Sequence, residues 1–215
     1  MGRTVFEDRR SELVAQKVIR NLEKRHMQAF YAKDGAEALE KALSLIPEGS
    51  SVGWGGSMSI EQIGLKDAVR QGNYTAIDRD TAADPAERSR LMRECLSADV
   101  FLMSTNALSE DGQLVNLDGL GNRVAALCFG PGSVIVIAGM NKLAKTLDDA
   151  VSRVRNYAAP VNLQRFEGNR TACRETGSCA DCIMDGCLCS QLVITRNCFP
   201  AGRIKVILVG EELGF

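Results

Sequence analysis

The hydrophobic positions of the N-terminal region follow a helical spacing. Val14, Val18 and Leu22 recur at every fourth residue with charged residues between them, which predicts an amphipathic helix over residues 7–32. A second apolar stripe lies in GAEALEKALSLI, where the preceding aspartate provides a helix cap and the following PEG ends the helix. We therefore expect residues 1–50 to form a helical N-terminal segment in front of the rest of the domain.

Short apolar runs separate the later helical stripes and predict strands. Strands are expected within residues 51–54, 74–78, 99–104, 133–139 and 203–215, and further helices within residues 35–46, 60–70, 84–96 and 146–160, the last ended by Pro160. Because strands alternate with helices and the central strands are continuously apolar, the pattern predicts an α/β domain with a mostly parallel sheet covered on both faces. The length of 215 residues and the lack of a linker favour a single domain over residues 1–215.

Three segments should meet at one edge of this sheet, because ligands bind in open parallel sheets where the strands end. They are GGSMS (55–59), STNALSEDG (104–112) and GMNK (139–142). Gly55 and Gly56 let the backbone approach a ligand closely, and Ser57 and Ser59 add hydroxyl groups. Ser59 also begins a capping-box pattern for the helix that follows. The stretch matches no established phosphate-loop motif, so a plain tight turn is an equal alternative.

The segment between the two most apolar strands is dense in polar residues and glycines. Asn106, Glu110, Asp111, Asn116, Asp118, Asn122 and Arg123 fall within 18 residues, with glycines at 112, 119 and 121. The Asp-Gly pair in SEDGQLV is typical of a hairpin tip, and Asp118 and Asn122 equally suit turns and helix caps. Arg123 follows the glycines and precedes an apolar run, where a guanidinium group suits a carboxylate or phosphate.

Overall charge and hydropathy exclude several classes of protein. With 26 Lys and Arg against 27 Asp and Glu, the net charge of −1 gives no footprint for nucleic acid. No apolar run approaches the roughly 18 residues of a membrane helix, and the charged N-terminus lacks the apolar core of a signal peptide. We expect a soluble, cytoplasmic protein. The only histidine, His26, lies in the predicted first helix, so acid–base chemistry would have to pair a carboxylate with Lys142.

Six of the eight cysteines lie within 26 residues, and Cys95 and Cys128 stand apart. The clustered residues are Cys173, Cys179, Cys182, Cys187, Cys189 and Cys198. A C-x2-C pair lets two thiolates bind one metal ion, so Cys173, Cys179, Cys182 and either Cys187 or Cys189 are candidate ligands of zinc or an iron–sulfur cluster. Disulfides and free thiols are the alternatives. The cysteine-rich insertion spans residues 173–198.

Long stretches of the chain resemble the LUD-domain family, whose members are associated with lactate utilisation. The resemblance rests on GGSMSIEQIGLKDAVRQGNYTAIDRD, STNALSEDGQLVNLDGLGNRVAALCFGP and VIVIAGMNKL, and it runs in order from about residue 10. The closing ILVGEELGF resembles a short, single-domain subgroup with a cysteine cluster near the C-terminus. This subgroup pattern implies Cys189, just before the LVI run, as the fourth metal ligand, with Cys187 and Cys198 spare.

The resemblance implies a Rossmann-like fold of the sugar-phosphate isomerase and CoA transferase type. The ligand-site positions that it implies are Gly55, Gly56, Ser57, Asn106, Asn116, Gly119, Asn122, Arg123, Asn141 and Lys142, to which the sequence pattern itself adds Ser59 and Asp118. Two departures stand against a direct transfer of chemistry. Ser104-Thr105-Asn106 replaces the acidic residue of many related isomerases, and Glu110 lies in a turn-like stretch unsuited to the glutamate nucleophile of CoA transferases.

Three functional hypotheses follow. The first is an enzyme or enzyme subunit that binds a small anionic metabolite and takes part in the oxidation of lactate or a similar acid. The second is an isomerase-like or CoA-transferase-like enzyme with a structural zinc site. The third is a non-catalytic accessory protein that senses a metabolite or docks to an iron–sulfur redox partner protein. The sequence leaves open whether the chain forms a homo-oligomer.

Overall fold

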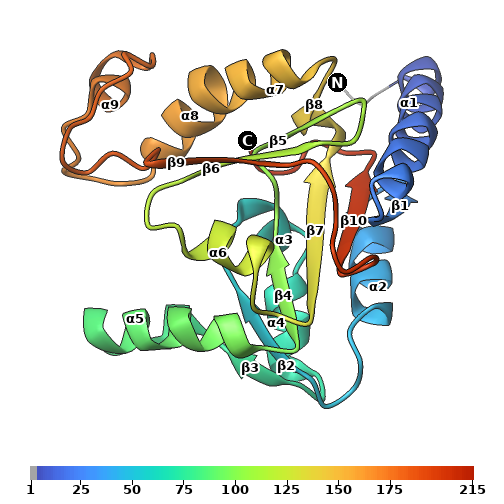
Figure 1. Cartoon of the computed structure of the whole chain (residues 1–215), viewed down its shortest axis with the longest axis horizontal. Coiled ribbons are helices and arrows are strands. Elements are labelled where there is room, and N and C mark those ends of the chain that lie inside the picture. Colours follow the sequence, from blue (N-terminus) through green and yellow to red (C-terminus); the bar gives the residue numbers. More distant parts are fainter. Residues whose placement is uncertain (1–3) are drawn as a thin grey trace.

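The computed structural model describes residues 4–215, and its centre is a six-stranded, all-parallel sheet (Figure 1). In spatial order the strands are β1 (Gln28–Ala32), β10 (Ile204–Val209), β7 (Ser133–Gly139), β4 (Val100–Met103), β2 (Ser51–Trp54) and β3 (Thr75–Ile77). Each strand predicted from the sequence is present in this sheet. The predicted α/β class with a mostly parallel sheet is confirmed.

Helices cover both faces of this sheet, and the side chains of the central strands alternate between the two apolar layers. In β4, Phe101 and Met103 enter one layer, whereas Val100 and Leu102 enter the other. The first layer packs against α1 (Val5–Lys24) and α6 (Asn122–Cys128), and the second against α2 (Gly35–Ser44), α3 (Met58–Gln62) and α4 (Leu65–Gln71). Burial on both faces is the physical reason for the continuously apolar strands.

A second, four-stranded sheet stands beyond the carboxyl ends of the main strands. Its order is β8 (Leu143–Ala144), β5 (Ala107–Ser109), β6 (Leu114–Asp118) and β9 (Gln191–Thr195). β5 and β6 form an antiparallel hairpin, which confirms the expected hairpin tip. The segment of α7 (Leu147–Arg153) and α8 (Ala159–Leu163) packs on it, followed by α9 (Ala172–Thr176). The sequence pattern did not predict this sheet, because its outer strand β9 is short and half-exposed.

The expectation of a purely helical N-terminal segment is wrong. Helix α1 ends at Lys24, and His26 adopts a left-handed backbone conformation with φ of 60°. Residues 28–32, which the helical spacing assigned to the first helix, form β1 and pair in parallel with β10. An edge strand takes its hydrogen bonds from a distant neighbour, so the local spacing of apolar residues did not reveal it.

Two other helix boundaries differ from those predicted. The helix expected over residues 60–70 is two short helices, because Gly64 breaks it with φ of 73°, and Ser57 rather than Ser59 caps the first. The helix expected to end at Pro160 continues into α8 through a π-helical turn, Val154–Ala158. Pro160 has no N–H group to donate to the preceding turn, and the π-helical turn lies directly before it.

Helix α5 (Pro85–Glu94) has no buried residue and extends away from the sheet (Figure 1). Asp84 caps it as expected, because its Oδ1 accepts a hydrogen bond from the N–H of Glu87 at 2.8 Å. Among residues 4–215, no helix is both long enough and apolar enough to cross a membrane.

Candidate functional site

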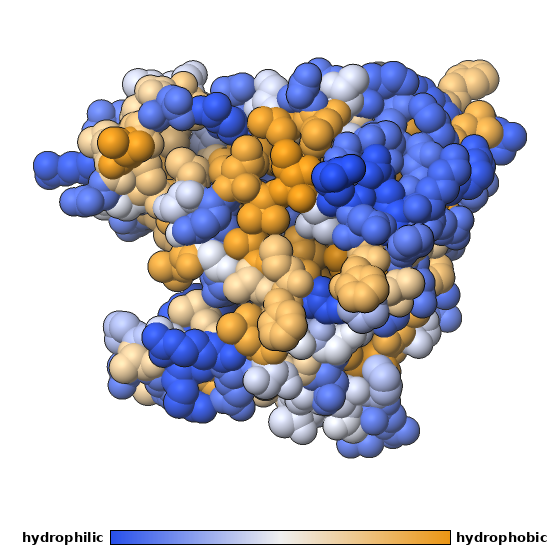
Figure 2. All heavy atoms as spheres, viewed as in Figure 1, coloured by the Kyte–Doolittle hydropathy of each residue, from blue (hydrophilic) through white to orange (hydrophobic). Residues whose placement is uncertain are grey.

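A cavity of about 660 Å³ lies where the main strands end and the second sheet begins. Gly56 and Ser57 follow β2, Ser104 to Asn106 follow β4, and Lys142 follows β7, and all of them line it. The molecule is hollowed between α5 and the region of α8 and α9 (Figure 2). The three segments thus meet as the parallel topology requires, and the volume lies within the range of small-molecule sites.

The lining of this cavity carries more positive than negative charge. Seven basic and four acidic side chains contribute: Lys66, Arg70, Arg79, Arg88, Arg123, Lys142 and Arg165 against Glu61, Asp67, Asp80 and Asp118. This excess of positive charge inside a concave, partly low-dielectric space favours an anionic ligand. It is a local property, since the whole chain has a net charge of −1.

Arg79 has few hydrogen-bond partners among residues 4–215. Its side chain is only 12% exposed, and its Nε lies 3.7 Å from Oδ1 of Asp80, without a hydrogen bond to any residue of the described range 4–215. The hydrogen bond that its guanidinium group donates goes to Sδ of Met92, a weak acceptor, at 3.4 Å. Burial, followed by the charge of Arg88, lowers the pKa of Arg79 from its ordinary value.

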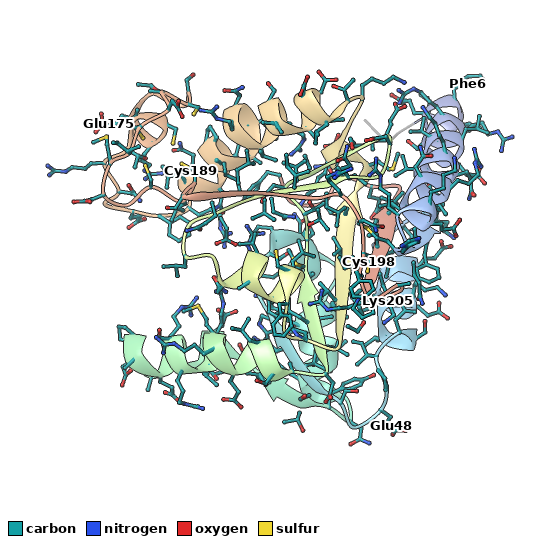
Figure 3. All side chains as sticks on the ribbon, viewed as in Figure 1. Phe6, Glu48, Glu175, Cys189, Cys198 and Lys205 are labelled. Atoms are coloured by element: carbon teal, nitrogen blue, oxygen red, sulfur yellow. The ribbon has the colours of Figure 1, made fainter. Side chains whose placement is uncertain are left out.

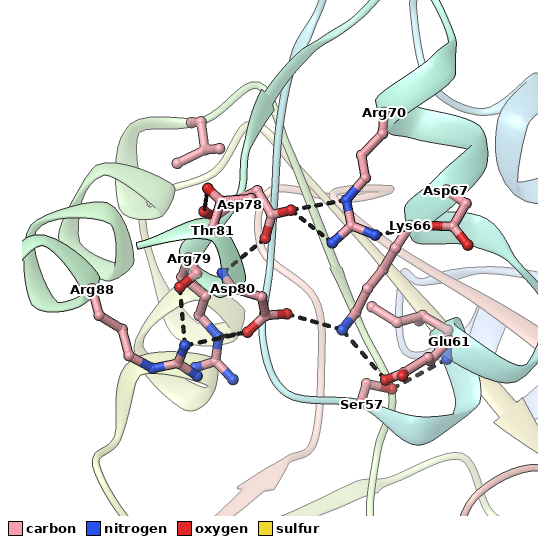
Figure 4. A network of polar contacts seen from close by, with 12 residues as sticks. Ser57, Glu61, Lys66, Asp67, Arg70, Asp78, Arg79, Asp80, Thr81 and Arg88 are labelled. Carbon is pink, nitrogen blue, oxygen red and sulfur yellow. Dashed lines mark hydrogen bonds and ion pairs between the residues drawn. The ribbon is translucent and has the colours of Figure 1, made fainter. Parts of the chain in front are cut away.

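The carboxylates near Arg79 are occupied by other cations (Figure 4). Oδ2 of Asp80 accepts from Nζ of Lys66 at 3.1 Å, and Oδ1 of Asp80 accepts from Arg88 at 3.4 Å. Asp78 receives two hydrogen bonds from Arg70. Burial raises the pKa of Asp80, but the bond from Lys66 and the surrounding positive charges outweigh it and leave that pKa low. The carboxylates of this network are therefore paired with other cations. No oxygen atom in residues 4–215 accepts a hydrogen bond from the guanidinium group of Arg79.

Lys142 lies at the end of β7 and is 3% exposed. Its Nζ donates to Oγ of Ser59 at 2.9 Å and to Oγ of Ser104 at 2.8 Å. No ion pair found in residues 4–215 includes Lys142. Burial, and then the positive charges of Arg153 and Arg123, lower the pKa of Lys142 to about 7. A buried amine with this pKa exchanges its proton near neutrality, a property that concentrates at functional sites.

Arg123, which the sequence singled out, is held firmly by groups of the protein. Its Nε forms an ion pair with Oδ2 of Asp118 at 3.0 Å. Its Nη2 donates to the carbonyl oxygen of Leu117 at 3.0 Å and to Oδ1 of Asn106 at 3.4 Å. Arg123 therefore contributes charge to the cavity from a fixed position, with most of its donors already engaged.

Five cysteines line a separate cavity of about 270 Å³ beside β9. They are Cys173, Cys179, Cys182, Cys187 and Cys189. The sulfur atoms of Cys182 and Cys187 are 3.3 Å apart. The hydrogen bond with Cys187 lowers the pKa of the Cys182 thiol, whereas burial is the main cause that raises the pKa of Cys187 to about 11.

Five thiols around one cavity suit a soft metal ion in their chemistry. Nevertheless, no three or more His, Cys, Asp or Glu residues within 4–215 stand together in a geometry that would hold a metal. Cys198 lies apart from this group, near β10, whereas Cys189 lies near β9 (Figure 3). The sulfur of Cys198 accepts a hydrogen bond from the N–H of Ile204 at 3.3 Å.

Comparison with known families identifies the chain. A family model described as the LUD domain matches residues 15–209. The chain belongs to the LUD-domain family. A search of curated proteins found no match.

A solved structure of a DUF162 family protein has a similar overall fold. A DUF162 family protein from Deinococcus radiodurans aligns with a TM-score of 0.54 at 12% identity, over 93% of this chain and 98% of that one. Ribose 5-phosphate isomerase A from Neisseria gonorrhoeae has a TM-score of 0.33 at 16% identity, over 51% of this chain and 52% of its own. The delta subunit of eIF2B from Chaetomium thermophilum has a TM-score of 0.33 at 15% identity, over 65% and 54%.

The structure of this LUD-domain protein divides the predicted ligand residues into two groups. Those that line the larger cavity are Gly56, Ser57, Asn106, Asp118, Gly119, Asn122, Arg123 and Lys142. Those that lie behind its wall are Gly55, Ser59, Asn116 and Asn141. Their roles as ligand contacts stay predictions.

The four residues behind the wall have other surroundings. Gly55 faces the aliphatic part of Arg123, and Ser59 is fully buried beneath Lys142. Asn116 is also fully buried, and neither atom of its amide has a hydrogen-bond partner in the described range 4–215. Oδ1 of Asn141 accepts a hydrogen bond from the N–H of Leu213 at 3.1 Å, and Nδ2 donates to the carbonyl oxygen of Gly214. Asn141 therefore anchors the segment after β10.

Sequence reasoning missed the cations that follow β3. Arg79 and Asp80 come directly after the strand, at the same carboxyl edge as the segments that were identified. The rule that located those segments applies equally to β3, so this signal was present. No comparable signal marked Arg165, which reaches the cavity from the end of α8 through the packing of the second sheet.

Proposed function

We propose that this LUD-domain protein binds a small anionic metabolite, a carboxylate or a phosphate, in the 660 Å³ cavity. The observation that carries the proposal is Arg79, a guanidinium group 12% exposed that lines the cavity and has no oxygen acceptor of a hydrogen bond among residues 4–215. A buried cation without its hydrogen bonds is costly, and a bound carboxylate or phosphate supplies the missing acceptors in a bidentate arrangement.

Other groups around the cavity support the same kind of ligand. Gly56 and Ser57 of the glycine turn before α3 line the cavity, and Lys142 provides an amine close to its charge transition at neutral pH. In this arrangement Arg79 holds the anion, the glycine turn admits it closely, and Arg123, which packs against the neighbouring glycine, adds positive charge. Asn106 and Asp118 hold Arg123 in place.

We further propose that the protein takes part in the oxidation of lactate or a similar small acid in the cytoplasm. Membership of the LUD-domain family and the positive cavity support this role. The expected ligands are then small hydroxy or oxo acids, whose carboxylate groups match Arg79.

The cysteine cavity is proposed as a metal site of Cys173, Cys179, Cys182 and either Cys189 or Cys187. Five soft donors around one small space support it, and the 3.3 Å separation of two sulfurs is close to the spacing of thiolates on a shared metal ion. Zinc would tie the segment before β9 to the second sheet, whereas an iron–sulfur cluster would accept or donate electrons.

Thermal unfolding with pyruvate or inorganic phosphate tests the anion site. Both should raise the melting temperature of the wild-type protein by mass action. Arg79→Met should weaken binding by about tenfold or more, because hydrogen bonds to charged groups are lost. Arg93→Met is the matched control, since Arg93 is an exposed arginine of α5 that does not line the cavity. An equal thermal shift in wild type and Arg79→Met would show that the anion binds elsewhere.

A further inference from the structure

The amine of Lys142 is held in a defined orientation by two serine hydroxyl groups. Oγ of Ser59 donates to the carbonyl oxygen of Leu213 at 3.2 Å, and Oγ of Ser104 donates to the carbonyl oxygen of Thr105 at 3.2 Å. The hydrogen atom of each hydroxyl group is therefore used in a hydrogen bond to a backbone carbonyl oxygen. Both serine oxygens accept from Lys142, so two N–H bonds of the amine point at Ser59 and Ser104.

A neutral amine has two N–H bonds and one lone pair. With both N–H bonds engaged by serines, the lone pair takes the remaining tetrahedral direction. Lys142 and Ser104 both line the cavity, whereas Ser59 lies fully buried behind it. The cavity is therefore the side from which a ligand would approach the amine of Lys142.

The surroundings of Lys142 also favour its neutral form. No carboxylate in residues 4–215 forms an ion pair with it, and its charged neighbours are Arg153 and Arg123. Arg153 is itself fixed, since it donates to the carbonyl oxygens of Asn106 and Asn141. Removal of a lysine from water next to other cations is a known means of making its amine a nucleophile.

We propose that Lys142 acts as a nucleophile and forms an iminium adduct with a ligand that carries both a carbonyl group and an anionic group. The proposal rests on the proposed anion site, which supplies the second half of the recognition. The substrate class is therefore small oxo acids or phosphorylated aldehydes and ketones. Acetone-like carbonyl compounds without an anionic group would lack the contact with Arg79.

The step balances without an oxidant or a metal. The lone pair of Nζ attacks the carbonyl carbon, a C–N bond forms, and the carbonyl oxygen takes a proton from solvent. The resulting carbinolamine takes up a second proton, loses water as the C–O bond breaks, and transfers one amine proton back to solvent. The product is a protonated imine, so that amine, carbonyl compound and one proton give iminium and water. Ser59 and Ser104 orient the nitrogen for the attack, and the iminium nitrogen, which keeps one N–H bond, retains a hydrogen bond to one of the two serines.

Borohydride trapping on the wild-type protein tests this step. The protein is incubated with pyruvate, dihydroxyacetone phosphate or acetone, reduced with borohydride, and digested for peptide mapping by mass spectrometry. We expect the reduced adduct at Lys142 with one or both anionic probes, at about tenfold or more the level with acetone, because only the anionic probes gain a charged contact. Exposed Lys145 serves as the internal control for nonspecific reaction.

Absence of an adduct at Lys142 with both anionic probes, while Lys145 reacts, would overturn the proposal. The thermal shift separates this failure from failure of the anion site: a shift without an adduct removes the iminium step alone, and neither a shift nor an adduct removes both. Lys142→Arg removes the nucleophilic amine and should retain the pyruvate-induced shift without any adduct at this position. If that variant does not fold, the peptide map of the wild-type protein still shows whether Lys142 forms the adduct.

Discussion

The guanidinium group of Arg79 lies directly against Gly56: a Cβ atom on Gly56 would stand 2.8 Å from Nη2 of Arg79. The neighbouring glycine has a different partner. A Cβ atom on Gly55 would stand 2.4 Å from Cγ and 2.7 Å from Cδ of Arg123. The two glycines of the turn therefore leave space for two different arginines. Gly56 leaves space for the guanidinium end of Arg79, and Gly55 leaves space for the middle of the Arg123 side chain.

Alanine substitutions should separate the roles of these glycines. Gly56→Ala displaces only the flexible end of Arg79, so we expect a change in unfolding free energy of about 0.5 kcal/mol or less, with weaker binding of pyruvate or phosphate. Gly55→Ala forces the middle of the fixed Arg123 side chain to move and should cost about 2 kcal/mol, as overpacking does. Denaturant unfolding and thermal shift measure the two effects. Unchanged anion binding in Gly56→Ala would contradict the assigned position of the ligand.

The negative charge of Asp118 should stabilise the folded protein and should also weaken the binding of an anion in the cavity. Asp118 and Arg123 are 6% and 14% exposed, so Asp118→Asn leaves a buried guanidinium group without its charge partner. We expect a loss of about 3 kcal/mol in unfolding free energy together with tighter binding of phosphate. Asp67→Asn is the control, because this carboxylate at the cavity is 69% exposed in its pair with Arg70 and should matter little to stability. Weaker phosphate binding in Asp118→Asn would refute the electrostatic argument.

Lys142 should make stability rise with pH above neutrality. Its pKa is lowered to about 7 in the folded protein, against 10.5 for an ordinary lysine. Between these values the unfolded chain binds a proton that the folded chain does not, so raising the pH stabilises the folded state, and below about 7 this gain is lost. We expect the stability of the wild type to increase relative to Lys142→Met between about pH 7 and pH 9. Parallel curves for the two proteins across that range would show that the amine titrates normally.

Protein purified without oxygen should contain zinc or an iron–sulfur cluster at the cysteine cavity. Metal analysis and the visible absorption spectrum distinguish the two. Cys182→Ser should lose the metal, and Cys128→Ser should keep it, because Cys128 is exposed and lies outside the cavity. Comparison of Cys187→Ser with Cys189→Ser identifies the fourth ligand. Removal of the metal by a chelator should lower the melting temperature, since binding free energy is also folding free energy. Metal-free protein under these conditions would exclude the site.

Local pattern determined much of this structure. The apolar runs and helical stripes predicted the parallel α/β sheet, because a strand buried on both faces must be apolar throughout its length. Strand polarity then predicted that the segments after β2, β4 and β7 meet at one edge, as they do around the cavity. The glycine turn and Lys142 were found in this way, although the chemistry of neither was evident.

Tertiary contacts decided the rest. β1 is a strand because its backbone forms hydrogen bonds with β10. The helical spacing of the apolar residues before β1 gives no sign of that partner. Lys142 has its lowered pKa because the fold buries it and brings Arg153 and Arg123 near it. The hydroxyl groups that accept its hydrogen bonds belong to Ser59, 83 residues away, and Ser104, 38 residues away. The spacing of apolar residues is a property of neighbours along the chain. Burial and electrostatic surroundings depend on which distant residues the fold brings together, and for this reason only the structure revealed the surroundings of Arg79 and of Lys142.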